Sequence, residues 1–119
     1  AWRRGDLLVD RLNRGLYTYG PDEPGVSVCD LNCRRYWPPV YAEPGARPVG
    51  PFTLATGPEG RAIWAWQGQP LYRWTGDRTR GSARGEVVDE WFLVRVPRER
   101  LSEVVAYFPM PAAAPAPAR

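Results

Sequence analysis

Two stretches of the same pattern organise the sequence: Leu16-Tyr17-Thr18-Tyr19-Gly20-Pro21-Asp22 and Leu71-Tyr72-Arg73-Trp74-Thr75-Gly76-Asp77. Both have the form Leu-Tyr-x-aromatic-x-x-Asp, and the second follows the first at an offset of 55 positions. A tryptophan comes after each stretch, Trp37 in the first case and Trp91 in the second. The sequence therefore predicts an internal repeat, in which each motif belongs to one of two similar units.

The composition favours short strands over long helices. The chain of 119 residues is about the size of one domain. Its 14 prolines and 12 glycines interrupt it at short intervals, as turns between strands do. We therefore expect a mostly β fold, with a polar leader at residues 1–6 and one domain at 7–100 that contains two degenerate β halves, at 7–41 and 52–96.

Apolar patterns within each half predict individual strands. The first half suggests a hairpin of residues 7–9 and 16–19 around a turn at Asn13-Arg14-Gly15. The second half suggests a three-stranded meander of residues 52–55, 61–66 and 71–74, with a closing strand at 91–96. The segment 61–66 is apolar on both faces, which is typical of a central or covered strand.

The C-terminal region, residues 101–119, has a different pattern. Pro97 suits the first turn of a helix, and apolar residues follow it at helical spacing: Leu101, Val104, Val105 and Phe108. A short helix is predicted, with a strand as the alternative. Residues 110–119 are nearly all proline and alanine and should form an extended tail.

The motif residues can be explained by structure or by binding. The aromatic side chains could fill the core between two β halves or line a surface for a ligand. Each aspartate follows an aromatic strand, where a short carboxylate can accept backbone N–H groups and hold the next loop. We interpret the motif residues as structural: Tyr17, Tyr19, Asp22, Trp37, Tyr72, Trp74, Asp77 and Trp91.

The only two cysteines are Cys29 and Cys33. In an exported protein they would form a disulfide, whose small loop limits its stabilising effect to about 2 kcal/mol. In a cytosolic protein they would remain two thiols.

The two motifs and their surroundings resemble a family of small secreted or lipid-anchored bacterial proteins with a Tyr-x-(Phe/Trp/Tyr)-x-x-Asp motif, described as a secreted repeat of unknown function. The resemblance rests on both motifs, on Cys29 and Cys33, and on Trp37-Pro38-Pro39. It implies export beyond the cytoplasmic membrane, which agrees with a disulfide between the cysteines. Ala1 stands where a lipid-anchored member would have cysteine, so the resemblance points to a soluble exported form or a trimmed N-terminus.

The sequence lacks most of the residue types and spacings that catalysis and cofactor binding require. Without any histidine, neither a Ser-His-Asp nor a Cys-His arrangement can form. The acidic residues Asp22, Glu23 and Asp30 lack the spacing of an EF-hand loop. We expect no enzyme activity, no cofactor and no bound metal. The net charge of +3 predicts a weakly basic surface and not a nucleic-acid site.

These observations suggest a non-catalytic exported module that interacts with another protein. It could be an accessory subunit on the extracytoplasmic side of a larger membrane assembly, with a redox assembly as one option. The alternative is a protein that binds a small ligand, either carbohydrate or metal. No apolar run is long enough to cross a membrane, so any membrane association would depend on the partner. The residues expected to contact the partner lie in a predicted loop at residues 76–85 and in the C-terminal region: Arg78, Arg80, Arg84, Leu101, Val105, Phe108 and Met110.

Overall fold

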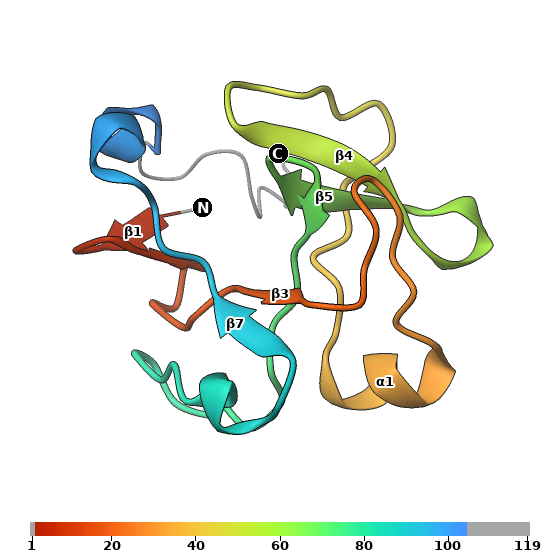
Figure 1. The fold of residues 1–119 in the computed structure, drawn as a ribbon, viewed down its shortest axis with the longest axis horizontal. Helices are drawn as coiled ribbons and strands as arrows, with labels where there is room; N and C mark the ends of the chain where they lie inside the picture. The colour runs from red at the N-terminus through yellow and green to blue at the C-terminus, as the bar shows by residue number, and fades with distance from the viewer. Residues whose placement is uncertain (1, 105–119) are drawn as a thin grey trace, which may run out of the picture.

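The computed structural model describes residues 2–104 of the chain. Short strands predominate in it and form three small sheets (Figure 1), so the prediction of a mostly β fold is confirmed. One α-helix and two 3-10 helices lie between strands, and a third 3-10 helix follows the last strand. In chain order the elements are β1 (Trp2–Arg4), β2 (Leu7–Val9), β3 (Tyr17–Tyr19), α1 (Leu31–Tyr36), β4 (Phe52–Thr56), η1 (Pro58–Gly60), β5 (Ala62–Trp66), β6 (Gln69–Pro70), η2 (Gly85–Val87), β7 (Trp91–Leu93) and η3 (Arg98–Glu103).

The largest sheet is the antiparallel meander β4-β5-β6. Its middle strand, β5, is buried at every residue after Ala62, as its apolar pattern predicts. The third strand differs from the prediction, because it ends at Pro70 and does not extend over residues 71–74. The chain leaves this sheet because the N–H of Tyr72 donates to the carbonyl of Tyr17, in a different part of the molecule.

The N-terminal residues form a hairpin. Residues 2–4, expected within a polar leader, are strand β1 and pair antiparallel with β2. Gly5 lies in the turn between them with a φ of +61°, a conformation that glycine adopts without steric cost. The expected contact between β2 and the chain after Gly15 also forms, since the N–H of Leu16 donates to the carbonyl of Leu8. Strand β3, however, continues onward and pairs with β7.

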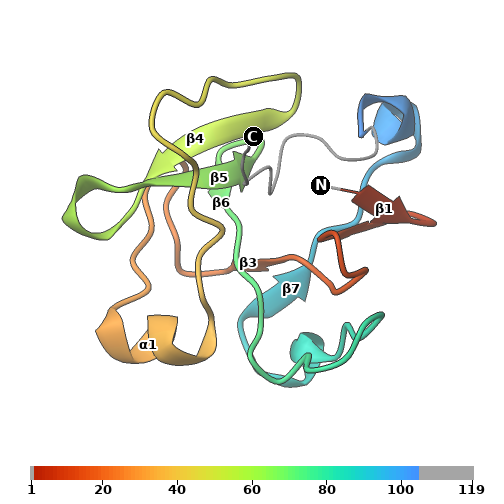
Figure 2. The ribbon, with the colours of Figure 1, turned by 180° about the vertical axis from the view of Figure 1, so that it is seen from behind.

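The two predicted halves are interleaved in space. Figure 2 shows β4, β5 and α1 on one side of β3 and β7, and β1 and η3 on the other. Backbone hydrogen bonds explain this arrangement. Trp64 in β5 donates its N–H to Val40, which follows the first motif, and Leu8 in β2 donates its N–H to Val94, which follows the second. Each hairpin therefore packs against the segment that follows the other half's motif.

Two clusters of buried side chains form the core. The first lies among β2, β4, β5 and the segment after β7, and comprises Leu8, Leu16, Phe52, Trp64, Trp66, Leu71, Val94, Val96 and Val104. The second surrounds the two motifs and comprises Tyr17, Cys29, Trp37, Tyr72 and Trp91. Most of the motif aromatics are thus core residues.

The chain after Pro97 forms η3, a 3-10 helix, where the apolar spacing predicts a short helix. Leu101 packs against the first core cluster and Val104 is buried in it. Residues 105–119, which include Val105, Phe108, Met110 and the proline- and alanine-rich tail, lie outside the described residues.

Candidate functional site

The side chains of the two motifs meet in crossed pairs. The hydroxyl of Tyr17 donates to Asp77 Oδ2 and that of Tyr72 donates to Asp22 Oδ2, each at 2.6 Å. The tyrosine of each motif is therefore bonded to the aspartate of the other. Both tyrosines are completely buried, and both aspartates are buried as well.

The same aspartates hold the loops that follow them. Asp22 Oδ1 accepts the N–H of Val28 at 2.7 Å. Asp77 Oδ1 accepts the hydroxyl of Ser82 and the N–H of Arg84, both at 2.8 Å. Sequence reasoning pointed to these loop contacts but not to the crossed tyrosine contacts. The available signal was the tyrosine hydroxyl itself, because a buried hydroxyl requires a hydrogen-bond partner.

The tyrosine oxygens also accept hydrogen bonds. The N–H of Gly85 donates to Tyr17 Oη at 2.7 Å. Tyr72 gives its only proton to Asp22, so in its 2.5 Å contact with Ser27 the serine hydroxyl is the donor. A residue with a side chain would not fit at position 85 without a shift of its neighbours, because an added Cβ would lie 2.7 Å from the Tyr17 ring and 2.8 Å from the Trp37 ring.

Burial shifts the pKa of both tyrosines and of Asp22. Burial, and secondarily the hydrogen bond to the partner aspartate, raises the pKa of Tyr17 and of Tyr72 far above the ordinary value of a tyrosine. Burial also raises the pKa of Asp22, while the hydrogen bonds from Tyr72 and Val28 oppose this effect. The tyrosines are therefore protonated donors at neutral pH, and neither supplies a phenolate that could act as a base or nucleophile.

Four aromatic rings form a continuous stack beside the crossed pairs. Trp37 and Trp91 lie at its centre, with ring centroids 3.8 Å apart and planes 1° from parallel. Tyr19 stacks on the outer face of Trp91 at 4.3 Å, and Trp74 lies against Trp37 at 5.6 Å. Trp37 and Trp91 are buried, and only the end rings, Tyr19 and Trp74, are half-exposed.

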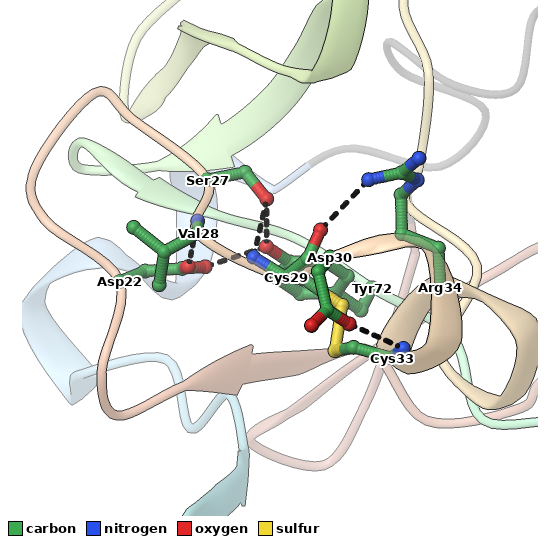
Figure 3. Close-up of a disulfide and its surroundings, with 8 residues drawn as sticks. All are labelled: Asp22, Ser27, Val28, Cys29, Asp30, Cys33, Arg34 and Tyr72. Carbon is green, nitrogen blue, oxygen red and sulfur yellow. Dashed lines mark hydrogen bonds between the residues drawn. A yellow bond between two sulfur atoms is a disulfide. The ribbon is translucent and has the colours of Figure 1, made fainter.

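The disulfide fixes the loop after the first motif (Figure 3). Cys29 and Cys33 are bonded, so the disulfide expected for an exported protein is present. Asp30 caps helix α1 by accepting the N–H of Cys33 at 2.9 Å, and Arg34 Nη1 donates to the carbonyl of Cys29 at 2.9 Å. The bridge therefore joins α1 to the buried Cys29, whose loop Asp22 holds from the other end.

The three arginines expected to contact a partner, Arg78, Arg80 and Arg84, are exposed on the loop of residues 76–85. The ion pairs among residues 2–104 are Arg14 with Asp10, Arg95 with Glu86, and Arg100 with Glu103, so none of the three loop arginines has a carboxylate partner there. The other expected contact residue that the structure describes, Leu101, is half-buried on η3 and is not part of this loop.

The described residues contain no group of three or more histidine, cysteine or acidic side chains that could hold a metal ion. Of the three acidic residues considered for an EF-hand site, Asp22 is buried and accepts hydrogen bonds from Val28 and Tyr72, whereas Glu23 and Asp30 are exposed. No helix within residues 2–104 has the length and apolar character of a membrane span.

The arrangement defines a small, mostly β module braced by two crossed motifs. Residues 53–95 of the chain match the model of a protein family described as a secreted repeat of unknown function. This confirms the resemblance over the region from β4 to β7, which contains the second motif. No curated protein and no solved structure matches the chain. That the first motif is a second copy of the same repeat stays a prediction from the sequence.

Proposed function

We propose that the protein is a non-catalytic, extracytoplasmic interaction module that docks onto an acidic surface of a partner protein. The observation that carries this proposal is the loop of residues 76–85, which presents Arg78, Arg80 and Arg84 to solvent without carboxylate partners among the described residues. The match to a secreted family supports the location.

Internal hydrogen bonds fix the backbone of this loop. Asp77 accepts from Ser82 and from the N–H of Arg84, while Gly85 donates to Tyr17. The N–H of Gly81 donates to the carbonyl of Leu12 at 3.1 Å. A loop fixed in this way loses little backbone entropy on binding, which favours affinity.

The charge of the loop suits an acidic partner. Arginine is enriched at protein interfaces, and its planar guanidinium group can make two parallel hydrogen bonds to a carboxylate. Uncompensated charges of one sign also speed the encounter with an oppositely charged surface. An accessory subunit on the extracytoplasmic side of a membrane assembly would bind in this manner.

The absence of catalysis is supported by how the motif groups are used. The two cysteines are joined in a disulfide, the tyrosines are buried and protonated, and each motif aspartate is engaged by a tyrosine hydroxyl and by at least one backbone N–H. Groups committed in this way are not available for proton transfer or attack on a substrate.

The test is purification of the tagged protein from the envelope of its native host at low and high salt. At low salt the wild type should co-purify with a partner. The triple variant Arg78→Gln/Arg80→Gln/Arg84→Gln should recover at least about tenfold less of that partner. The matched control, Arg35→Gln/Arg47→Gln/Arg98→Gln, changes three exposed arginines outside the loop that form no ion pair among the described residues. This variant should recover as much partner as the wild type. Recovery as a free monomer only, or equal losses in both variants, would show the proposal to be wrong.

One observation favours the alternative of a carbohydrate-binding protein. Trp74 and Tyr19, at the two ends of the ring stack, are half-exposed, and exposed aromatic rings commonly stack on sugars. Calorimetry against a panel of oligosaccharides separates the two functions. Saturable binding that Trp74→Ala abolishes, with the fold intact, would favour the carbohydrate function.

A further inference from the structure

A cavity of about 340 Å³ lies where the turn after β2 meets the chain after Trp37. Val40 and Tyr41, both half-buried, supply apolar surface, and the buried residues Leu16 and Pro39 also line it. The charged residues that line it are Asp10, Arg11, Arg14 and Arg73. Its volume is at the small end of the range for ligand sites in proteins.

The only acidic residue of the cavity is fully committed to its own turn. Asp10 Oδ1 accepts the N–H groups of Leu12 and Arg14, both at 2.9 Å. Asp10 Oδ2 accepts from Arg14, from Nε and from Nη2, both at 3.0 Å. The Asp10 carboxylate and the Arg14 guanidinium therefore neutralise each other.

Arg73 is the cation that this pair leaves unmatched. It is half-buried, and its guanidinium has neither a hydrogen bond nor an ion pair with any residue of the described chain. Burial and the neighbouring Arg14 lower the pKa of Arg73, and Asp10 opposes this only as the smallest of the three effects. Withdrawing an unpaired charge from water costs free energy, which a bound anion would offset. Arg11 also lines the cavity, but it is exposed and its charge is solvated.

We propose that this cavity binds a small monocarboxylate with an apolar body. The carboxylate would accept the paired N–H groups of Arg73, a geometry that the guanidinium group favours. The apolar body would lie against the half-buried Val40 and Tyr41. The apolar surface that this contact removes from water would favour such a ligand over a simple inorganic anion. The site is independent of the proposed docking loop, because none of Arg78, Arg80 and Arg84 lines the cavity.

The first test is calorimetry on the full chain with phenylacetate, its neutral counterpart phenylacetamide, and sulfate. Phenylacetate should bind at one site, and the other two should bind at least about tenfold more weakly, because each lacks either the charge or the apolar body. Failure of phenylacetate to bind saturably, or binding of phenylacetamide or sulfate as tight as that of phenylacetate, would overturn the proposal.

Variants and spectroscopy locate the site. Arg73→Gln should weaken phenylacetate binding at least about tenfold, Arg73→Lys should retain part of it, and the surface control Arg98→Gln should bind like the wild type. Circular dichroism checks that each variant is folded. On the wild type itself, phenylacetate should shift the amide resonances of Leu12, Val40 and Tyr41, so the result does not depend on the stability of a variant. Shifts confined to other regions, or equal losses for Arg73→Gln and Arg98→Gln, would show the assignment to be wrong.

Discussion

Tyr17 and Asp77, 60 positions apart in the chain, are joined by a buried hydrogen bond of 2.6 Å between the tyrosine hydroxyl and Asp77 Oδ2. The matching bond joins Tyr72 to Asp22. Because each tyrosine is bonded to the aspartate of the other motif, the loop after each motif depends on a side chain from the other motif. The interleaving of the hairpins has the same consequence, since each hairpin needs the segment that follows the other motif. We therefore expect the two halves to unfold together.

Replacing Tyr17 with phenylalanine should destabilise the protein by about 2–3 kcal/mol, because the change leaves both Asp77 Oδ2 and the Gly85 N–H buried without their partner. Urea unfolding followed by circular dichroism measures the loss. The matched control is Tyr36→Phe, at an exposed tyrosine, which should change the free energy of unfolding by less than about 0.5 kcal/mol. Equal effects of the two substitutions would contradict the buried role of the Tyr17 hydroxyl.

A double-mutant cycle should show energetic coupling across the motifs. Tyr72→Phe combined with Asp22→Asn should give a coupling free energy of about 1–2 kcal/mol, because the two side chains share one buried hydrogen bond. The control cycle pairs Tyr17→Phe with Asp22→Asn, two changes within the first motif whose side chains share no such bond, and should give a smaller value. If the cycle within one motif gave the larger coupling, the crossed arrangement would be wrong.

The strands and loops that the sequence predicts correctly are those fixed by local composition. Strand β5 follows from an apolar pattern on both faces. The loop after Tyr19 follows from its prolines and glycines, and the loop after Trp74 from its glycines. The pairing partner of a strand cannot be predicted in this way, because side-chain alternation does not specify which distant segment will pair with it. For this reason the pairing of β3 with β7 could not be read from the sequence.

The candidate sites show the same limit. The motif residues could be selected because the pattern occurs twice, yet no local feature indicates which aspartate a given tyrosine will bind. Strand β1 was missed because Trp2-Arg3-Arg4 lacks an apolar alternation, and only its pairing with β2 makes it a strand. No local feature distinguishes Arg73 from the exposed arginines, since its half-buried place in the cavity depends on contacts among three distant segments.

Reducing the disulfide between Cys29 and Cys33 should lower the free energy of unfolding by about 2 kcal/mol, because the bridge restricts the unfolded chain only over a short loop. Urea unfolding with and without a phosphine reductant measures the difference. A Cys29→Ser/Cys33→Ser variant serves as the control, and the reductant should leave its stability unchanged. An unchanged stability of the wild type on reduction would show that the bridge contributes nothing to the fold.

Alkaline pH should unfold the protein through its buried tyrosines. Since burial raises the pKa of Tyr17 and Tyr72 above the ordinary value of 10.0, their contribution to stability is fully present below that pH and is lost as the pH rises beyond it. Each should add a slope of about 1.4 kcal/mol per pH unit, because the unfolded chain releases a proton that the folded chain retains. Tyr19, whose pKa burial and nearby carboxylates also raise, should act in the same direction.

Urea unfolding from neutral pH to above pH 10 measures this slope, and the ultraviolet absorbance of tyrosinate counts the ionised side chains. Tyr17→Phe should reduce the slope by about 1.4 kcal/mol per pH unit, whereas the exposed control Tyr36→Phe should leave it unchanged. Of the six tyrosines, Tyr17 and Tyr72 should ionise only when circular dichroism reports unfolding. Ionisation of all six near pH 10 in a folded protein would show that the crossed hydroxyls are accessible to solvent, and would contradict the brace they form with Asp77 and Asp22.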